Sequence, residues 1–146
     1  MSITQGMTTS FKVELFTLTH DFGVAGDTFK IALYTSSASL GPTTTAYSST
    51  NEVTGTGYTA GGATLTNVAP SSSGTTAIVD FADVTFSTVT FSTTASAPRG
   101  ALIYNSSKSN KAVAVLDFGR SILKTAADLV VTMPTFDGQN AIIRIL

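Results

Sequence analysis

The stretch that decides the fold is TTAIVDFADVTFSTVTFSTTASAPRGALIYNSSKSNKAVAVLDF, residues 75–118. It contains four short apolar runs rich in β-branched and aromatic residues: TTAIVDF (75–81), VTFSTVTF (84–91), GALIYN (100–105) and KAVAVLDF (111–118). The separating segments Ala-Asp, SAPRG and NSSKSN are turn-like, because they are rich in Gly, Pro, Ser, Asn and Asp. Strands at such short, regular spacing, with no helix between them, are typical of an antiparallel β-sandwich or a jelly-roll-like barrel.

The same pattern continues on both sides of this stretch. Further strands are expected at TFKIALYT (28–35), ATLTNV (63–68), DLVVTM (128–133) and AIIRIL (141–146). In the first of them Phe29, Ile31 and Leu33 share one face, because alternate residues of a strand point the same way. PSSSG, GRSILKTAA and PTFDG are interpreted as turns or connections. Helix-sized periodic runs are missing after the N-terminal segment, so an α/β fold is not expected.

The N-terminal region predicts one short helix in SFKVELFTLTH, residues 10–20. Ser10 is the candidate N-cap, and Phe11, Leu15 and Leu18 recur at the spacing of one buried helix face. Phe11, Val13 and Leu15 also alternate as in a strand, which leaves that alternative open. We expect an N-terminal arm over residues 1–10 and a single β-sandwich domain over residues 11–146.

The composition limits the possible functions. The chain has 146 residues, no cysteine, a net charge of −1 and only 12% charged residues, against a usual value of about 25%. Disulfides and thiolate metal sites are therefore excluded, and no apolar run approaches the ~20 residues of a membrane-spanning helix. The first ten residues lack the basic start and apolar segment of a signal peptide. Serine and threonine make up roughly three residues in ten, which favours a surface packed against other proteins but also suits any β protein.

A glycine cluster in NEVTGTGYTAGGATL, residues 51–65, resembles a dinucleotide-binding fingerprint. Gly55, Gly57 and Ala60 spell G-x-G-x-x-A, and Asp80 follows at about the distance of a ribose-binding carboxylate. The fingerprint works only between a buried strand and a helix, whereas here the flanking residues are polar and rich in helix breakers. We therefore interpret the segment from Gly55 to Gly62 as an ordered surface loop anchored by Tyr58, and exclude a cofactor loop.

The other chemically suggestive residues favour structural roles. His20 and Asp21 are adjacent, but no G-x-S-x-G nucleophile elbow accompanies them, and His20 is expected to contact the carbonyls at the end of the helix. Asp80 and Asp83 are interpreted as turn residues, since no loop has acidic residues at calcium-ligand spacing. Basic residues are scattered rather than clustered, which argues against nucleic-acid binding. Asn105 opens an N-x-S sequon that matters only in a secreted eukaryotic protein.

Several runs of this chain resemble a family of small structural proteins of tailed bacteriophages. They are DTFKIALYTSSASL (27–40), TTAYSSTNEVTGTGYTAGGATLT (44–66), VDFADVTFS (79–87), RGALIYN (99–105), KAVAVLDFG (111–119) and NAIIRI (140–145). NEVTGTGYTAGG and RGALIYN are the most specific, and the resemblance extends from about Phe11 to Ile145. The segment FSTTASAP, before RGALIYN, is longer than the family leads us to expect. The resemblance implies a virion component assembled in the cytoplasm of a bacterial host, with no catalytic residues and no cofactor.

Within a virion, the favoured role is a capsid cement or decoration protein that bridges major capsid subunits, as a homo-oligomer. A tail or neck component, such as an adaptor between tail and fibre, is the alternative, and a carbohydrate-binding β module is a remote one. No enzymatic activity, small-molecule substrate, nucleic acid or membrane is expected as part of its function. The expected contact residues lie in the N-terminal arm, the long connection over residues 36–57 and the glycine loop: Met1, Ile3, Met7, Tyr47, Gly55, Gly57, Tyr58, Gly61 and Gly62.

Overall fold

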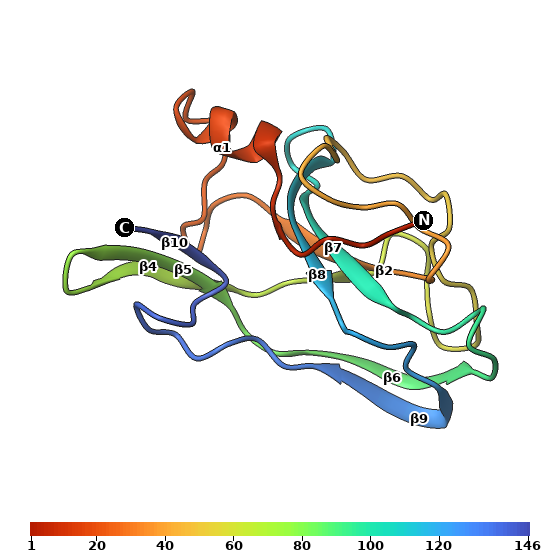
Figure 1. Ribbon diagram of the computed structural model, residues 1–146. Coiled ribbons are helices and arrows are strands. Elements are labelled where there is room, and N and C mark those ends of the chain that lie inside the picture. Colours follow the sequence, from red (N-terminus) through yellow and green to blue (C-terminus); the bar gives the residue numbers. More distant parts are fainter.

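The computed structural model describes residues 1–146 and consists of ten strands and one short helix (Figure 1). In chain order the elements are β1 (Gly6–Met7), α1 (Thr9–Leu15), β2 (Phe29–Tyr34), β3 (Ala63–Thr64), β4 (Asn67–Ser73), β5 (Thr76–Phe81), β6 (Val84–Phe91), β7 (Gly100–Asn105), β8 (Lys111–Asp117), β9 (Lys124–Val131) and β10 (Ile143–Ile145). All pairings between these strands are antiparallel.

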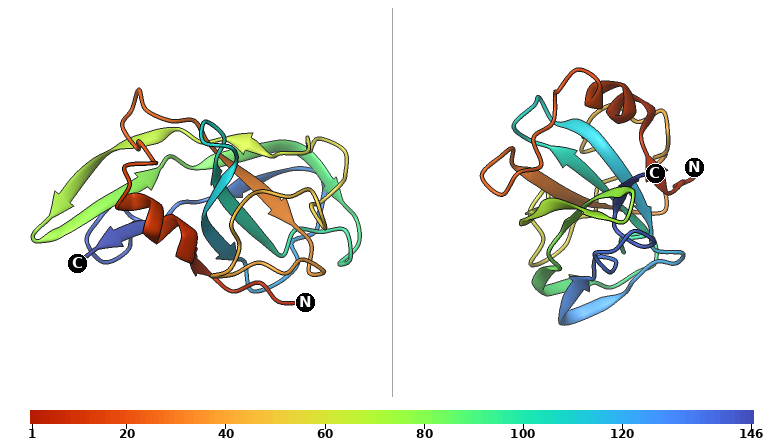
Figure 2. Two further views of the ribbon diagram at one scale, coloured as in Figure 1. Left: turned by 90° about the horizontal axis from the view of Figure 1, so that it is seen from above. Right: turned by 90° about the vertical axis from the view of Figure 1, so that its left-hand side faces the viewer.

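The strands form three sheets. A five-stranded sheet has the order β1-β8-β7-β2-β3, a three-stranded sheet has the order β10-β5-β4, and β6 pairs with β9. Figure 1 shows the β6–β9 pair below the five-stranded sheet and the β4–β5 hairpin extending to one side. The two views in Figure 2 place α1 on the outside of the molecule, away from the β6–β9 pair. The expectation of a mainly β, sandwich-like fold with a short N-terminal helix is confirmed, and the sheets do not close into a barrel.

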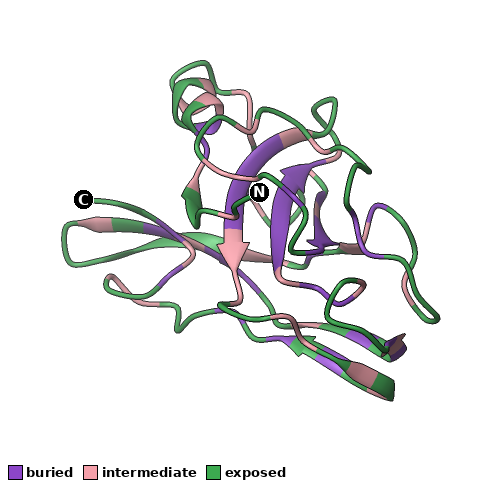
Figure 3. Ribbon diagram, turned by 45° about the vertical axis from the view of Figure 1, so that its right-hand side comes forward, coloured by how far each residue is buried: buried purple, intermediate pink, exposed green.

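The main core lies between the five-stranded sheet and the other two sheets. Twenty buried residues form it, among them Ile31 and Ile103 from the upper layer and Phe86 and Leu129 from the lower one. Figure 3 shows the burial concentrated in the central strands of the five-stranded sheet. Every residue of β7 is buried, because this strand has a packed layer on both faces. For the same reason the alternation expected for β2 is largely hidden. Phe29, Ile31 and Leu33 face the main core, but Ala32 and Tyr34 are buried on the opposite face.

The long connection over residues 36–57 covers the outer face of the five-stranded sheet. A second cluster of seven buried residues, including Tyr34 and Leu102, lies beneath it. Leu40 and Tyr47 pack against this cluster, as expected from the sequence. Isolated bridges from Tyr34 to Glu52 and from Ala46 to Lys111 fix the connection in place.

The N-terminal arm belongs to the five-stranded sheet. Gly6 and Met7 pair with β8, and Ile3 forms a parallel bridge with Leu40. The amide of Thr4 donates to the carbonyl of Leu40 at 2.8 Å. Contacts within the same chain therefore fix several residues of the expected N-terminal arm, residues 1–10.

The helix differs from the expected one at both ends. Thr8, not Ser10, is the N-cap, and its hydroxyl accepts a hydrogen bond from the amide of Phe11. α1 ends at Leu15, and Leu18 is 91% exposed, so it does not continue the buried face. The amides of Leu18 and Thr19 bond back to the carbonyls of Leu15 and Glu14, which is the Schellman arrangement. Leu18 thereby occupies a left-handed position (φ 54°) that favours glycine and costs another residue roughly 1–2 kcal/mol.

The single strand expected at residues 63–68 is divided between β3 and the start of β4, which belong to different sheets. Two strand boundaries also differ. The PSSSG segment does not form a separate turn, because Pro70 to Ser73 belong to β4 and the tight turn to β5 is made at Gly74 with φ 60°. The strand expected at residues 128–133 begins earlier, at Lys124. β4 is mostly exposed and lies at the edge of its sheet, where serine and proline are tolerated because few backbone groups need a partner. In both cases the extra residues are in a strand because they pair with a neighbouring strand, β5 for β4 and β6 for β9. Alternation within one segment does not reveal such pairing.

Candidate functional site

The glycine loop folds around one buried carboxylate, Glu52. Its Oε1 accepts hydrogen bonds from the Tyr58 hydroxyl at 2.6 Å and from the Gly61 amide at 2.7 Å. Its Oε2 accepts a hydrogen bond from the Tyr47 hydroxyl at 2.7 Å. We call Glu52, Tyr47, Tyr58 and Gly61 the Glu52 cluster. Because only 8% of Glu52 is exposed, these donors replace the water that its charge has lost.

All four tyrosines of the chain converge here. Tyr47 and Tyr104 stack with ring centroids 4.8 Å apart, and the Tyr104 hydroxyl donates to the Gly61 carbonyl. The Tyr34 hydroxyl donates to the Ser48 carbonyl at 2.6 Å. Burial, followed by the hydrogen bond to Glu52, raises the pKa of Tyr47 to about 12. Burial also raises the pKa of each of the other three tyrosines, and the nearby Glu52 charge adds to the effect.

The loop glycines permit close packing against neighbouring strands. A Cβ on Gly62 (φ 74°) would lie 1.8 Å from the Ile31 carbonyl oxygen. A Cβ on Gly57 (φ 80°) would lie 2.6 Å from the Thr88 carbonyl oxygen, and one on Gly55 would lie 2.5 Å from that of Thr90. The loop is ordered and anchored by Tyr58, as expected, and its glycines serve contacts inside the chain. Gly55 and Gly57 nevertheless have an exposed side, whereas Gly61 is buried.

Glu52 was not singled out from the sequence, although one signal marks it. It is the only charged residue between Lys30 and Asp80, in an otherwise apolar and hydroxyl-rich stretch. Tyr47, Tyr58, Gly61 and Gly62, all expected as contact residues, are brought together around it. Met1, Ile3 and Met7 are not part of this cluster, since the N-terminal arm lies along the other edge of the sheet, next to β8.

His20 belongs to a second polar network, beneath α1. Its side chain is fully buried; Nε2 lies 2.8 Å from Glu14 Oε2, and Nδ1 lies 2.9 Å from Asn105 Nδ2. Since the Asn105 amide group also donates to Asp27, it donates to Nδ1, and the His20 Nε2–H group donates to Glu14. The expected contact with the helix carbonyls is therefore wrong. Both ring nitrogens are engaged, one with Glu14 on α1 and the other with Asn105 at the end of β7, so His20 links the helix to β7.

Glu14 links this network to β8. Lys111 Nζ lies 2.8 Å from Glu14 Oε1, which gives the carboxylate two partners. Burial alone would raise the pKa of Glu14, but the hydrogen bonds from Lys111 and His20 and the positive charge of Lys111 lower it. Asn105, the sequon residue, is completely buried and accepts a hydrogen bond from the Ser107 amide. These residues bind one another and stabilise the docking of α1.

Asp80 and Asp83 have different environments. Asp80 is buried within β5, so its interpretation as a turn residue is wrong. Its Oδ1 accepts from the Phe81 amide, its Oδ2 has no hydrogen-bond partner, and burial raises its pKa. Asp83 lies in the two-residue connection between β5 and β6 and accepts from the Met133 amide at 2.7 Å. The turn interpretation holds for Asp83 alone.

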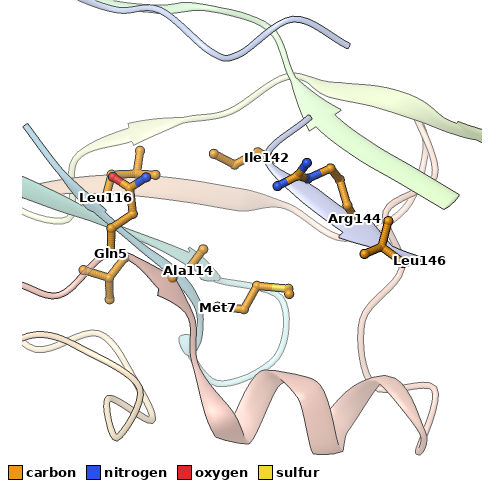
Figure 4. Close-up of a pocket in the computed structure, with 9 residues that line it drawn as sticks. Gln5, Met7, Ala114, Leu116, Ile142, Arg144 and Leu146 are labelled. Atoms are coloured by element: carbon orange, nitrogen blue, oxygen red, sulfur yellow. The ribbon is translucent and has the colours of Figure 1, made fainter. Parts of the chain in front are cut away.

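A cavity of about 370 Å³, which we call the edge slot, opens between two sheet edges (Figure 4). On one side is β1, the edge of the five-stranded sheet, with β8 behind it; on the other is β10, the edge of the three-stranded sheet. Six of its nine lining residues are hydrophobic; the nine are Gln5, Gly6, Met7, Ala114, Val115, Leu116, Ile142, Arg144 and Leu146. Met7, one of the expected contact residues, therefore faces an accessible apolar cavity.

A pair of apolar side chains projects from the end of α1. Phe16 is 90% exposed and Leu18 is 91% exposed, and we call this pair the apolar tip. Val13 lies one turn before Phe16 on the helix and is also exposed. Met1, an expected contact residue, is exposed at the other end of the N-terminal segment, while Ile3 is partly buried against the second cluster. The helical spacing of Phe11, Leu15 and Leu18 predicts Leu18 on the buried face, so the sequence pattern does not reveal this surface.

The structure and the comparisons with known proteins add three findings. No group of three or more His, Asp or Glu side chains is placed to hold a metal ion. The only helix, α1, has seven residues and is too short to cross a membrane. No protein-family model, curated protein or solved structure matches the chain.

Proposed function

We propose that this chain is a structural component of a tailed-bacteriophage virion, and in particular a capsid cement or decoration protein. The proposal starts from the resemblance of NEVTGTGYTAGG and RGALIYN to the phage family. The observation that carries it furthest is the exposure of Phe16 and Leu18 in a chain of which only 12% of the residues are charged. Interface cores favour aromatic side chains and contain few Lys, Glu and Asp residues. Such a surface suits permanent contact with neighbouring protein subunits.

The polar clusters support an assembly role over a catalytic one. Glu52 and His20 are the most chemically suggestive buried groups, and hydrogen bonds within the chain occupy both of them. The tyrosine hydroxyls that a carbohydrate binder would offer to a ligand also bond inside the chain. The carbohydrate-binding alternative therefore loses its main chemical basis.

A cement protein adds binding free energy across joints between capsid subunits. Each contact can be modest, because many copies bind the same lattice together. The major capsid protein is the partner that this role requires, with further copies of the chain as neighbours. A tail or neck protein would use the same kind of surface in far fewer copies.

Cryo-electron microscopy of particles that carry this protein tests the proposal. We expect its density as a regular array on the outer surface of the head, in a fixed ratio to the major capsid protein. Density confined to the tail or neck would support the alternative virion role. Absence from purified particles, judged by mass spectrometry, would refute both.

A further inference from the structure

Leu18 is unfavourable in the isolated chain for two independent reasons. Its backbone is held in the left-handed region, where glycine would avoid the steric strain. Its side chain is also almost entirely in water and gains nothing from the core. Phe16, two residues earlier, has the same exposure and makes none of the aromatic contacts found among the core rings. Neither side chain is buried when the monomer folds, so both are available for contact with another molecule.

The edge slot has the size that the apolar tip needs. An apolar cavity of about 150 Å³ holds a benzene-sized group, so 370 Å³ has room for a phenyl ring and a leucine side chain together. Figure 4 shows Met7 and Ala114 on one wall and Ile142 and Leu146 on the other, with space between the walls. The tip of the same molecule does not fill this slot, since both of its side chains are exposed.

The charges beside the two surfaces are also complementary. Arg144 lines the slot and is exposed. It forms none of the four ion pairs of the chain, although its Nη1 donates to the Gln139 carbonyl. The hydrogen bond from the Asn140 side chain and, more weakly, the Arg144 charge lower the pKa of Asp137. Asp21 follows the tip by three residues and is also exposed. A tip entering the slot of another molecule would bring an acidic residue toward a guanidinium group that has no ion pair within its own chain. Such pairs fix orientation more than they add affinity.

We propose that the apolar tip of one copy, Phe16 and Leu18, inserts into the edge slot of a second copy. The contact is heterologous, because different surfaces of the two copies meet, so repeated binding generates a ring or an open chain of subunits. The inference rests on the proposed virion role in naming homo-oligomers as the working form. The tip contact itself is a property of the purified chain and is tested without particles.

Sedimentation velocity of the purified chain from about 10 µM to 1 mM gives the first test, in the range of weak, small interfaces. Wild type is expected to self-associate as its concentration rises. The tip variant, Phe16→Ser with Leu18→Gly, should raise the dissociation constant by at least about 30-fold, the effect of losing one hot spot. The slot variant, Gln5→Trp with Leu146→Asp, should do the same by filling the cavity and removing apolar wall. Val130→Ser on β9, an apolar residue that is 50% exposed and belongs to neither surface, is the control and should associate like wild type.

Mixing the two defective variants distinguishes this contact from any symmetric one. The slot variant keeps an intact tip and the tip variant keeps an intact slot, so together they should form a one-to-one dimer that grows no further. Far-ultraviolet circular dichroism and thermal unfolding show that each variant is folded, and either single substitution at the tip provides a second test if the double variant is not. A monomeric wild type at 1 mM, unchanged association of the tip variant, or no heterodimer in the mixture would each overturn the proposal. The virion role is judged separately: if the protein is found in purified particles, that role stands even when one of these results rules out the tip contact.

Discussion

Replacing Glu52 by alanine removes the acceptor for three donors at once. The Tyr58 hydroxyl and the Gly61 amide lose their partner at Oε1, and the Tyr47 hydroxyl loses its partner at Oε2. Tyr47 is only half-buried and can turn to water. The other two donors stay inside, so the change is expected to loosen the glycine loop from β2.

The structure gives the size of the effect. A buried donor left without a partner costs about 1–3 kcal/mol, so two of them cost about 2–6 kcal/mol. Removing the buried charge offsets part of this cost, because a desolvated carboxylate is itself unfavourable. We expect a net loss of about 2–4 kcal/mol from a total stability of about 5–15 kcal/mol. Glu52→Gln should lose only about 1 kcal/mol, since its amide keeps one acceptor oxygen and can donate to Tyr47.

Urea unfolding followed by tyrosine fluorescence measures this loss. The chain has no tryptophan and its four tyrosines all lie around Glu52, so the signal reports on this region. With a slope of about 2 kcal/mol per molar urea, the alanine variant should unfold about 1–2 M earlier than wild type. Asp128→Ala is the matched control: its carboxylate accepts one exposed amide, and its midpoint should shift far less.

A stability of Glu52→Ala within about 0.5 kcal/mol of wild type, the usual range of a surface substitution, would contradict a stabilising role of the Glu52 cluster. Equal effects of the alanine and glutamine substitutions would contradict it as well, because the glutamine variant retains an acceptor. Hydrogen exchange at the Gly61 amide gives an independent reading, since loss of its acceptor should accelerate exchange there before global unfolding.

Three further predictions follow from groups held in unusual environments. Alkaline titration at 295 nm should show the native tyrosines ionising above their ordinary pKa of about 10, with Tyr47 near 12. The free energy of unfolding should be unchanged below pH 10 and fall as the pH rises further, because only the unfolded chain readily loses these protons. Asp80→Asn should become more stable relative to wild type as pH rises from about 4 to 7, since a raised carboxyl pKa stabilises the fold fully only below its unfolded value; a difference independent of pH would contradict this. Gly62→Ala should cost more than about 3 kcal/mol because its Cβ meets the Ile31 carbonyl, whereas Gly74→Ala, with the same sign of φ and open space, should cost about 1–2 kcal/mol in thermal unfolding; similar losses for the two would remove the steric argument.

Much of the strand content could be read from the sequence. β5, β6, β7 and β8 lie within one or two residues of their expected ranges, because short apolar runs between turn-like segments mark strands directly. The Ser-rich part of β4 and the start of β9 were missed, since these segments gain their order from a partner strand. The helix cap was shifted to Thr8 because its hydroxyl also donates to the Ala112 carbonyl, 104 residues further along the chain.

The sequence by itself determined a chain without cysteine chemistry, low in charge, and patterned for antiparallel strands with one short helix. Those properties are local or compositional, and each segment carries them independently of its neighbours. Only the tertiary structure decided that four tyrosines far apart in the chain meet at Glu52, that His20 is buried, and that Leu18 is exposed. It alone also created the edge slot, whose walls come from the two ends of the chain and from β8. Such features arise where strand pairing brings segments together that are far apart in the chain. Periodicity within one segment contains no information about which other segment it will contact.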